Sequence, residues 1–185
     1  MSEVVIVSAT RTPVGSFNGS FSNMSAADLG SIVIKEAVNR AKIKTSDVSQ
    51  VIMGQVLTAS CGQNPARQAS ISAGVPNEIT ALTINQVCGS GIRSIALGLE
   101  SIVSNESEIV VAGGQENMTQ APHCFHLRQA GIMGNSEMID SMIKDGIWDI
   151  FNGYHMGVTA ENVAEKWQIT RDQQDEFALN SQLKA

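Results

Sequence analysis

The sequence predicts an α/β protein with a three-layer α/β/α core and a mostly parallel sheet. Short runs of β-branched residues alternate with longer segments whose apolar residues recur every three or four positions. Of the 185 residues, 43% are hydrophobic, only 4% are aromatic and 16 are glycine. This composition is typical of a compact α/β domain. The three cysteines are far apart and lack the CxxC spacing of zinc sites, so we expect reduced thiols.

The first third of the chain predicts two strands and a helix between them. Residues 3–9, EVVIVSA, form a β-branched run without polar alternation, which indicates a central strand buried on both faces. A helix is predicted over residues 25–41, with Ser25 as its N-cap. Residues 48–56, VSQVIMGQV, predict the second strand. The predicted helix carries one apolar stripe, formed by Leu29, Ile32, Val33, Ala37, Val38 and Ala41.

Two further helices and two further strands follow in alternation. Residues 64–74 predict a helix with Asn64 at the cap, Pro65 in the first turn and Gly74 at the stop. A strand over 81–87 leads into a helix over 91–104, and a fourth strand is predicted over 108–114. The helix over 91–104 has a wide apolar face, in which Gly98 indicates close packing.

The composition and pattern of the sequence change after Asn117. The following stretch is rich in Met and Gly, holds all three histidines and shows no clear strand. Two helices are predicted beyond it, one from Thr159 and one from Thr170, where Thr170 and Gln173 form a capping-box pair. We therefore expect a core over 1–117 and an α-rich excursion over 118–185. The last helix runs to the final residue without a stop signal, so we expect a fragment of a longer chain.

Charge and hydropathy argue against two classes of partner. The net charge is −6 and no basic run occurs, so a nucleic-acid or membrane-surface partner is not expected. No apolar run approaches the ~18 residues that a membrane-spanning helix needs. The N-terminus has no cationic stretch ahead of its apolar run, and we expect a cytoplasmic protein unless a transit peptide preceded this sequence.

Cys88 lies in INQVCGSGIRS, between a predicted buried strand and a predicted helix. Backbone N–H groups are unpaired at a helix N-terminus and the helix dipole is positive there, which favours a thiolate and lowers a cysteine pKa. Gly89 and Gly91 remove side chains beside the sulfur, and an amide in the turn is placed to hold a developing oxyanion. The layout parallels the nucleophile elbow of serine hydrolases. The alternative is that Cys88 is a small buried hydrophobe.

Cys61 and Cys124 lack this strand-to-helix context, and we interpret both as structural. Gly113 and Gly114 end the fourth strand and permit close backbone approach, but GGQEN lacks the GxGxxG spacing of a dinucleotide site. Arg67 and Arg93 are interpreted as packing or interface residues.

Several motifs together resemble the thiolase family, in the order in which that family carries them. They are SATRTPVGSFNGSF, GQNPARQ, INQVCGSGIRS, VVAGGQENMTQAPH, MIDSMIKDGIWDIFNGYHMGVTAENVAEKW and RDQQDEFALNSQ, and they cover nearly the whole chain. The biosynthetic type is most similar, through APH…HLR and NGYHMG. The resemblance implies a three-layer core with a mixed, mostly parallel sheet, plus part of an α-rich loop domain.

The resemblance also implies a reaction. Two acetyl-CoA molecules condense to acetoacetyl-CoA, or acetoacetyl-CoA is cleaved in reverse, and the cysteine that matches Cys88 carries the acetyl group as a thioester. No metal or redox cofactor is implied. The loop domain of the family supplies much of the coenzyme A site, where His155 and Met156 match residues of the pantetheine channel and Ile147 matches an apolar residue nearby.

Other residues in the range 118–185 are interpreted without a catalytic role. Met133, Met138 and Met142 are explained equally well as lining of a pantetheine slot and as ordinary core residues, because methionine fills irregular gaps. His123 and His126 are interpreted as structural.

Thiolases are about twice this length, and this sequence lacks their second half. That half brings a histidine that activates the nucleophile and a second cysteine that acts as acid and base. The resemblance also implies that the first half closes its sheet with a strand that returns after the loop domain, and without that strand an open sheet edge invites association. We therefore expect little turnover from these residues alone, and a partner: the missing half, a complementing chain, or further copies in a homo-oligomeric dimer or tetramer. Two alternatives stay open, namely a thiolase for longer 3-ketoacyl-CoA chains and a noncatalytic acyl-CoA-binding or assembly fragment.

Overall fold

The computed structural model describes residues 3–128 and 133–184. The chain divides into two compact units, of which the first ends at His123 and the second begins at Cys124. The domain boundary that we expect after residue 117 stays a prediction.

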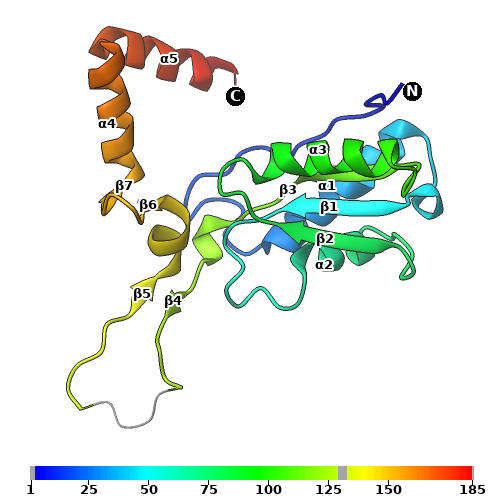
Figure 1. Ribbon diagram of the computed structural model, residues 1–185, viewed down its shortest axis with the longest axis horizontal. Coiled ribbons are helices and arrows are strands. Elements are labelled where there is room, and N and C mark those ends of the chain that lie inside the picture. Colours follow the sequence, from blue (N-terminus) through cyan, green and yellow to red (C-terminus); the bar gives the residue numbers. More distant parts are fainter. Residues whose placement is uncertain (1–2, 129–132, 185) are drawn as a thin grey trace. The chain divides into compact units, whose positions relative to one another are not determined.

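A parallel three-stranded sheet forms the centre of the first unit (Figure 1). Its strands are β1 (Gln50–Gly54), β2 (Thr80–Ile84) and β3 (Val110–Gly114), in the order β2-β1-β3. Val51, Ile52 and Met53 of the middle strand are all at most 2% exposed. The continuous apolar run of β1 therefore reflects burial on both faces of the sheet.

Helices cover both faces of this sheet. They are α1 (Ala26–Ala41), α2 (Pro65–Ser72) and α3 (Ser90–Val103). Val51 and Met53 lie in one apolar cluster with residues of α1 and α2. Gly54, which has the opposite orientation along the strand to Met53, lies against the first residues of α3. The unit is thus an α/β/α layer structure, as the sequence predicts.

The helix signals of the sequence are confirmed at α1 and α2. Ser25 and Asp28 form a complete capping box at the start of α1. The Asn64 side chain accepts from the Arg67 N–H, Pro65 opens α2, and Gly74 follows the helix with a φ of +88°. The buried stripe of α1 differs from the prediction: Ile34 is 1% exposed, whereas Ile32 is 47% exposed. The residues of α1 that are buried are Ala26, Gly30, Ile34 and Val38.

The central strand predicted over residues 3–9 is wrong. This segment pairs with no strand, and Val5, Ile6 and Val7 are 63%, 77% and 67% exposed. Two side chains at the end of this segment bind to α1. The Ser8 hydroxyl donates to the Ala37 carbonyl at 2.8 Å, and the Thr10 hydroxyl donates to the Val33 carbonyl at 3.1 Å. A β-branched run supplies strand propensity, but a strand also needs a neighbouring edge to bond, and propensity does not provide it.

Small residues, rather than the apolar face, join α3 to the sheet. The buried residues of this helix are Ser90, Ser94, Gly98 and Ser101. A Cβ on Gly98 would lie 3.2 Å from the Val110 side chain, which confirms the close packing predicted there. The large apolar side chains of α3 lie on its other faces, and the exposed ones are Ile92, Ile95, Leu99 and Val103.

The described residues of the second unit form very short strands, one π-helical turn and two helices. Its helices are α4 (Met156–Trp167), which begins three residues before the predicted start, and α5 (Arg171–Lys184), whose Thr170–Gln173 capping pair is confirmed. The sequence predicts no clear strand here, and the structure differs in having strands of two residues, of which β6 and β7 pair antiparallel. The short elements of this unit are β5 (Ile139–Asp140), the π-helical turn (Met142–Ile147), β6 (Trp148–Asp149) and β7 (Tyr154–His155), and β4 (His123–Cys124) lies at the boundary between the two units. None of the helices in the described part of the chain combines the length and apolar character that crossing a membrane requires.

Candidate functional site

The candidate site lies at the edge of the sheet where the three parallel strands end. The strand register aligns Gly54 with Ile84 on one side and with Gly114 on the other. Cys88 follows the end of β2 by four residues, and α3 begins two residues later at Ser90. The Cys88 side chain is exposed. The structure therefore places this thiol where the sequence predicts it, ahead of a helix N-terminus and open to solvent.

Glycines let the start of α3 approach the strand ends backbone to backbone. A Cβ on Gly54 would lie 2.6 Å from Ser90 atoms and 2.8 Å from the Gly91 nitrogen. A Cβ on Gly114 would lie 3.4 Å from the Gly91 Cα. Gly91 and Gly114 thus serve helix–sheet packing. The predicted part of Gly91 in opening space beside the sulfur stays a prediction.

The N-cap of α3 is Gly89, and no side chain caps this helix. No side-chain oxygen offsets the positive end of the helix dipole here, and the Ser90 N–H donates to the Val87 carbonyl at 3.1 Å. An anion next to the first turn of α3 is therefore favoured electrostatically.

A polar network lies at the ends of β1 and β3, and the sequence did not predict it. The Gln115 amide donates to the Gln55 Oε1 at 2.9 Å, and the Gln55 amide donates to the Leu57 carbonyl at 2.9 Å. The Glu116 carboxylate accepts from the Val56 N–H at 2.8 Å and from the Leu57 N–H at 3.4 Å. Burial raises the pKa of Glu116 above its ordinary value, although these backbone hydrogen bonds act in the opposite direction.

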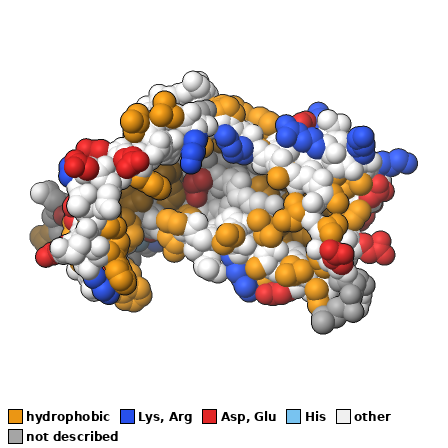
Figure 2. All heavy atoms as spheres, turned by 90° about the horizontal axis from the view of Figure 1, so that it is seen from above, with side chains coloured by type: hydrophobic (Ala, Val, Ile, Leu, Met, Phe, Trp, Pro, Cys, Tyr) orange, Lys and Arg blue, Asp and Glu red, His pale blue; other side chains and the backbone are white. Residues whose placement is uncertain are grey.

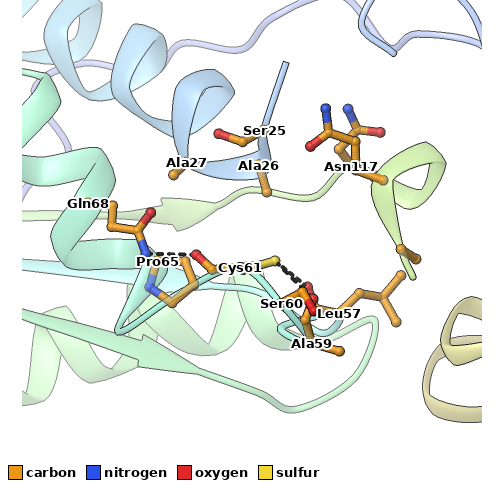
Figure 3. A pocket seen from close by; sticks show the side chains of 12 residues that line it. Ser25, Ala26, Ala27, Leu57, Ala59, Ser60, Cys61, Pro65, Gln68 and Asn117 are labelled. Atoms are coloured by element: carbon orange, nitrogen blue, oxygen red, sulfur yellow. Dashed lines mark hydrogen bonds between the residues drawn. The ribbon is translucent and has the colours of Figure 1, made fainter. Parts of the chain in front are cut away.

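Cys61 lies beside a cavity of about 160 Å³ in the first unit (Figure 3). The Cys61 thiol is half-buried and donates to the Leu57 carbonyl at 3.4 Å, while its own carbonyl accepts from the Gln68 amide at 2.8 Å. Cys88 does not line this cavity. These contacts agree with the structural interpretation of Cys61.

The predicted coenzyme A residues all lie in the second unit. His155 is the N-cap of α4, where its Nδ1 accepts from the Gly157 N–H at 2.9 Å. Met156 is the first residue of α4 and is 37% exposed, and Ile147 ends the π-helical turn, half-buried. Sequence reasoning missed the cap, because histidine is not among the usual N-cap residues. Contact of these three residues with a pantetheine arm stays a prediction.

Among residues 3–128 and 133–184, no group of three His, Cys, Asp or Glu side chains has the arrangement of a metal site. Large apolar side chains reach the surface in many places, as the orange patches in Figure 2 show. In the first unit the exposed apolar row of α3 is the most regular of them, with Ile92 at 75% and Val103 at 57% exposure.

A family model described as "Thiolase, N-terminal domain" matches residues 4–185. The chain belongs to the thiolase family. Among curated thiolase relatives, the acetyl-CoA acetyltransferase of Paracoccus denitrificans is 58% identical over 185 residues, which is all of this chain and 47% of the relative. That of Rhizobium meliloti is 58% identical over 182 residues, 98% of this chain and 46% of the relative.

A mammalian thiolase relative extends the comparison. The rat protein named "Acetyl-CoA acetyltransferase, cytosolic" is 52% identical over 182 residues, which is 98% of this chain and 46% of the relative. The chain thus spans about half the length of the curated thiolases that it matches.

Proposed function

We propose that this chain is the nucleophile-bearing part of an acetyl-CoA acetyltransferase and that Cys88 accepts the acetyl group. The observation that carries the proposal is the exposed Cys88 directly before the start of α3, a helix without a side-chain cap, in a chain that matches the thiolase N-terminal domain over residues 4–185. The names of the relatives supply the substrate class, acetyl-CoA. A cytoplasmic location is proposed from the cytosolic rat relative.

The proposed step is an acyl transfer onto sulfur. The Cys88 thiolate attacks the carbonyl carbon of acetyl-CoA, a carbon–sulfur bond to Cys88 forms, and the bond to the coenzyme A sulfur breaks. The leaving coenzyme A thiolate takes up a proton. We propose a backbone N–H of the first turn of α3 as the donor to the oxyanion of the tetrahedral intermediate, other than the Gly89 and Ser90 N–H groups, which donate to the Gln86 and Val87 carbonyls. A second acetyl-CoA then loses a methyl proton to the general base and attacks the acetyl carbonyl carbon. A carbon–carbon bond forms, the carbon–sulfur bond to Cys88 breaks, and the products are acetoacetyl-CoA and the Cys88 thiolate.

We propose further that Ile147, His155 and Met156 contact the pantetheine arm of the substrate. His155 uses its Nδ1 for the α4 cap, which leaves the Nε2–H as the donor that the imidazole offers to a ligand. Met156 and Ile147 add apolar, adaptable contact area. No metal or redox cofactor takes part in the proposed reaction.

A second part of the molecule completes the proposed enzyme. The relatives carry about as much chain again beyond the matched half. We propose that the corresponding portion supplies the general base and covers the apolar row of α3, which is at least 44% exposed at each of Ile92, Ile95, Leu99 and Val103. Because acid–base help is worth about 10²–10⁴ in rate, residues 1–185 alone are expected to show little turnover. A homodimer or tetramer is the expected assembly.

Intact-mass analysis after incubation with acetyl-CoA tests this function. The chain is mixed with the C-terminal portion of the Paracoccus denitrificans relative, and we expect one added acetyl group that is absent from Cys88→Ser. Cys61→Ser is the matched control and should keep the adduct, because the Cys61 thiol is occupied with backbone carbonyls beside a separate cavity. An adduct that persists in Cys88→Ser, or no adduct at all, would contradict the proposal.

A further inference from the structure

Val87, the residue before Cys88, has an unusual backbone conformation. Its φ is +49°, in the left-handed region that β-branched residues rarely adopt. The Val87 side chain is 51% exposed, so burial of this side chain does not account for the conformation. Something else in the turn must hold it, because such a conformation persists only where its surroundings over-determine it.

Two neighbouring side chains bind both polar groups of the Val87 backbone. The Asn85 Oδ1 accepts from the Val87 N–H at 2.8 Å. The Ser90 hydroxyl donates to the Val87 carbonyl at 2.6 Å and accepts from the Gln86 N–H at 2.8 Å. Side-chain hydrogen bonds from Asn85 and Ser90 thus hold the Val87 backbone, in addition to the backbone hydrogen bonds of the turn.

Asn85 and Ser90 both contact the chain at the end of β1. Ser90 is only 4% exposed and lies against Gly54, where no Cβ would fit. The Asn85 amide donates to the Val56 carbonyl at 3.4 Å, and the Val56 N–H is held by the Glu116 carboxylate at 2.8 Å. A shift of either side chain is thus resisted by the sheet.

We infer that Asn85 and Ser90 are positioning residues that hold Val87 left-handed and thereby keep the Cys88 thiol exposed in front of α3. The inference rests on the proposed role of Cys88. Neither side chain need touch the substrate. Each acts through the backbone of Val87, whose conformation sets the direction in which the chain enters Cys88 and α3.

The test is the rate of alkylation of Cys88 by iodoacetamide at fixed pH, relative to that of Cys61 in the same molecules, followed by peptide mass spectrometry of the 185-residue chain. We expect the ratio to fall about fivefold in Asn85→Ala and about tenfold in Ser90→Ala. Asn85→Ala loses one hydrogen bond within the turn and the longer one to the Val56 carbonyl, whereas Ser90→Ala loses two within the turn. Asn85 is exposed, so we expect Asn85→Ala to fold even where Ser90→Ala, at a buried position, does not.

Rescue by glycine separates positioning from a general loss of stability. Glycine adopts a positive φ without steric cost, so Val87→Gly added to either variant should restore the ratio to within about twofold of the parent. Ser94→Ala is the matched control. Ser94 is a fully buried serine of the same helix that donates to the Gly91 and Gly113 carbonyls, and its loss should leave the ratio unchanged.

An unchanged or increased ratio in Asn85→Ala, an equal fall in Ser94→Ala, or no rescue by Val87→Gly would overturn the inference. Alkylation needs neither acetyl-CoA nor turnover. A missing acetyl adduct alongside a normal alkylation pattern would therefore refute the proposed function and leave the positioning role standing.

Discussion

At the scale of single residues, the position of Cys88 follows from the sequence but its support does not. A strand run that ends four residues before a helical pattern is enough to predict a thiol at a helix start. Nothing in the local pattern predicts a left-handed valine at 87, because that conformation depends on Ser90 being buried against Gly54 of another strand. Contacts of this kind join residues that are far apart in the sequence.

Glu116 gives a pH-dependent prediction. Burial raises its pKa, so the folded chain binds the proton of this carboxyl at a pH where the unfolded chain has lost it. The stability that this group contributes is thus fully present below the model-peptide value of 4.5 and is lost as the pH rises through the folded pKa. Relative to Glu116→Gln, the parent should lose about 0.5 kcal/mol of unfolding free energy between pH 4 and pH 7, a small figure because solvent reaches part of the side chain.

Urea denaturation of both proteins at the two pH values provides the measurement. Glu108→Gln, at an exposed position, controls for the loss of one negative charge. A parent that gains stability relative to Glu116→Gln as the pH rises would mean that the Val56 and Leu57 amides outweigh burial.

At the scale of elements, periodicity predicted the helices and strands of the core but not which faces are buried. The pattern at α3 predicts a wide apolar face, yet the residues on the sheet are three serines and Gly98. Serine and glycine do not add to the apolar periodicity of a sequence. They face the sheet here because α3 lies so close to the strands that larger side chains would not fit. The strand predicted over 3–9 failed for the related reason that a strand requires an edge to pair with.

The close approach of α3 to β1 yields a matched pair of glycine variants. Gly54→Ala places a Cβ 2.6 Å from Ser90 atoms, including backbone, so the start of α3 must move. We expect a loss of about 1–3 kcal/mol in unfolding free energy, the usual range for overpacking, together with slower alkylation of Cys88. Gly113→Ala is the control: it pairs with Met53 in the register and its Cβ would make ordinary contacts at 3.6 and 3.7 Å.

Chemical denaturation and the Cys88-to-Cys61 alkylation ratio measure the two effects. If Gly113→Ala proved as damaging as Gly54→Ala, the helix start would not be the sensitive contact. The sequence alone offers no means of ranking these two glycines, since both lie near the ends of strands of similar composition.

At the scale of the whole molecule, the surface of α3 is the feature that a self-contained domain would not have. Four of its large apolar side chains lie in one row and are at least 44% exposed, whereas its serine and glycine face is covered by the sheet. Contiguous apolar surface of this kind marks an interaction site. The sequence predicts the apolar row correctly, but only the structure reveals that the sheet occupies the opposite face.

The proposal that the second half of the enzyme covers this row leads to a binding prediction. In the double variant Ile92→Ser, Leu99→Ser, two apolar side chains no longer enter the interface, so the Kd for the C-terminal portion of the Paracoccus denitrificans relative should rise at least about tenfold. Calorimetric titration measures this Kd. Ile71→Ser, on α2 and 41% exposed, removes an apolar side chain from the other face of the sheet and should leave the Kd within about twofold. Equal weakening by Ile71→Ser, or undiminished binding by the double variant, would place the partner elsewhere and leave the apolar row of α3 without its proposed cover.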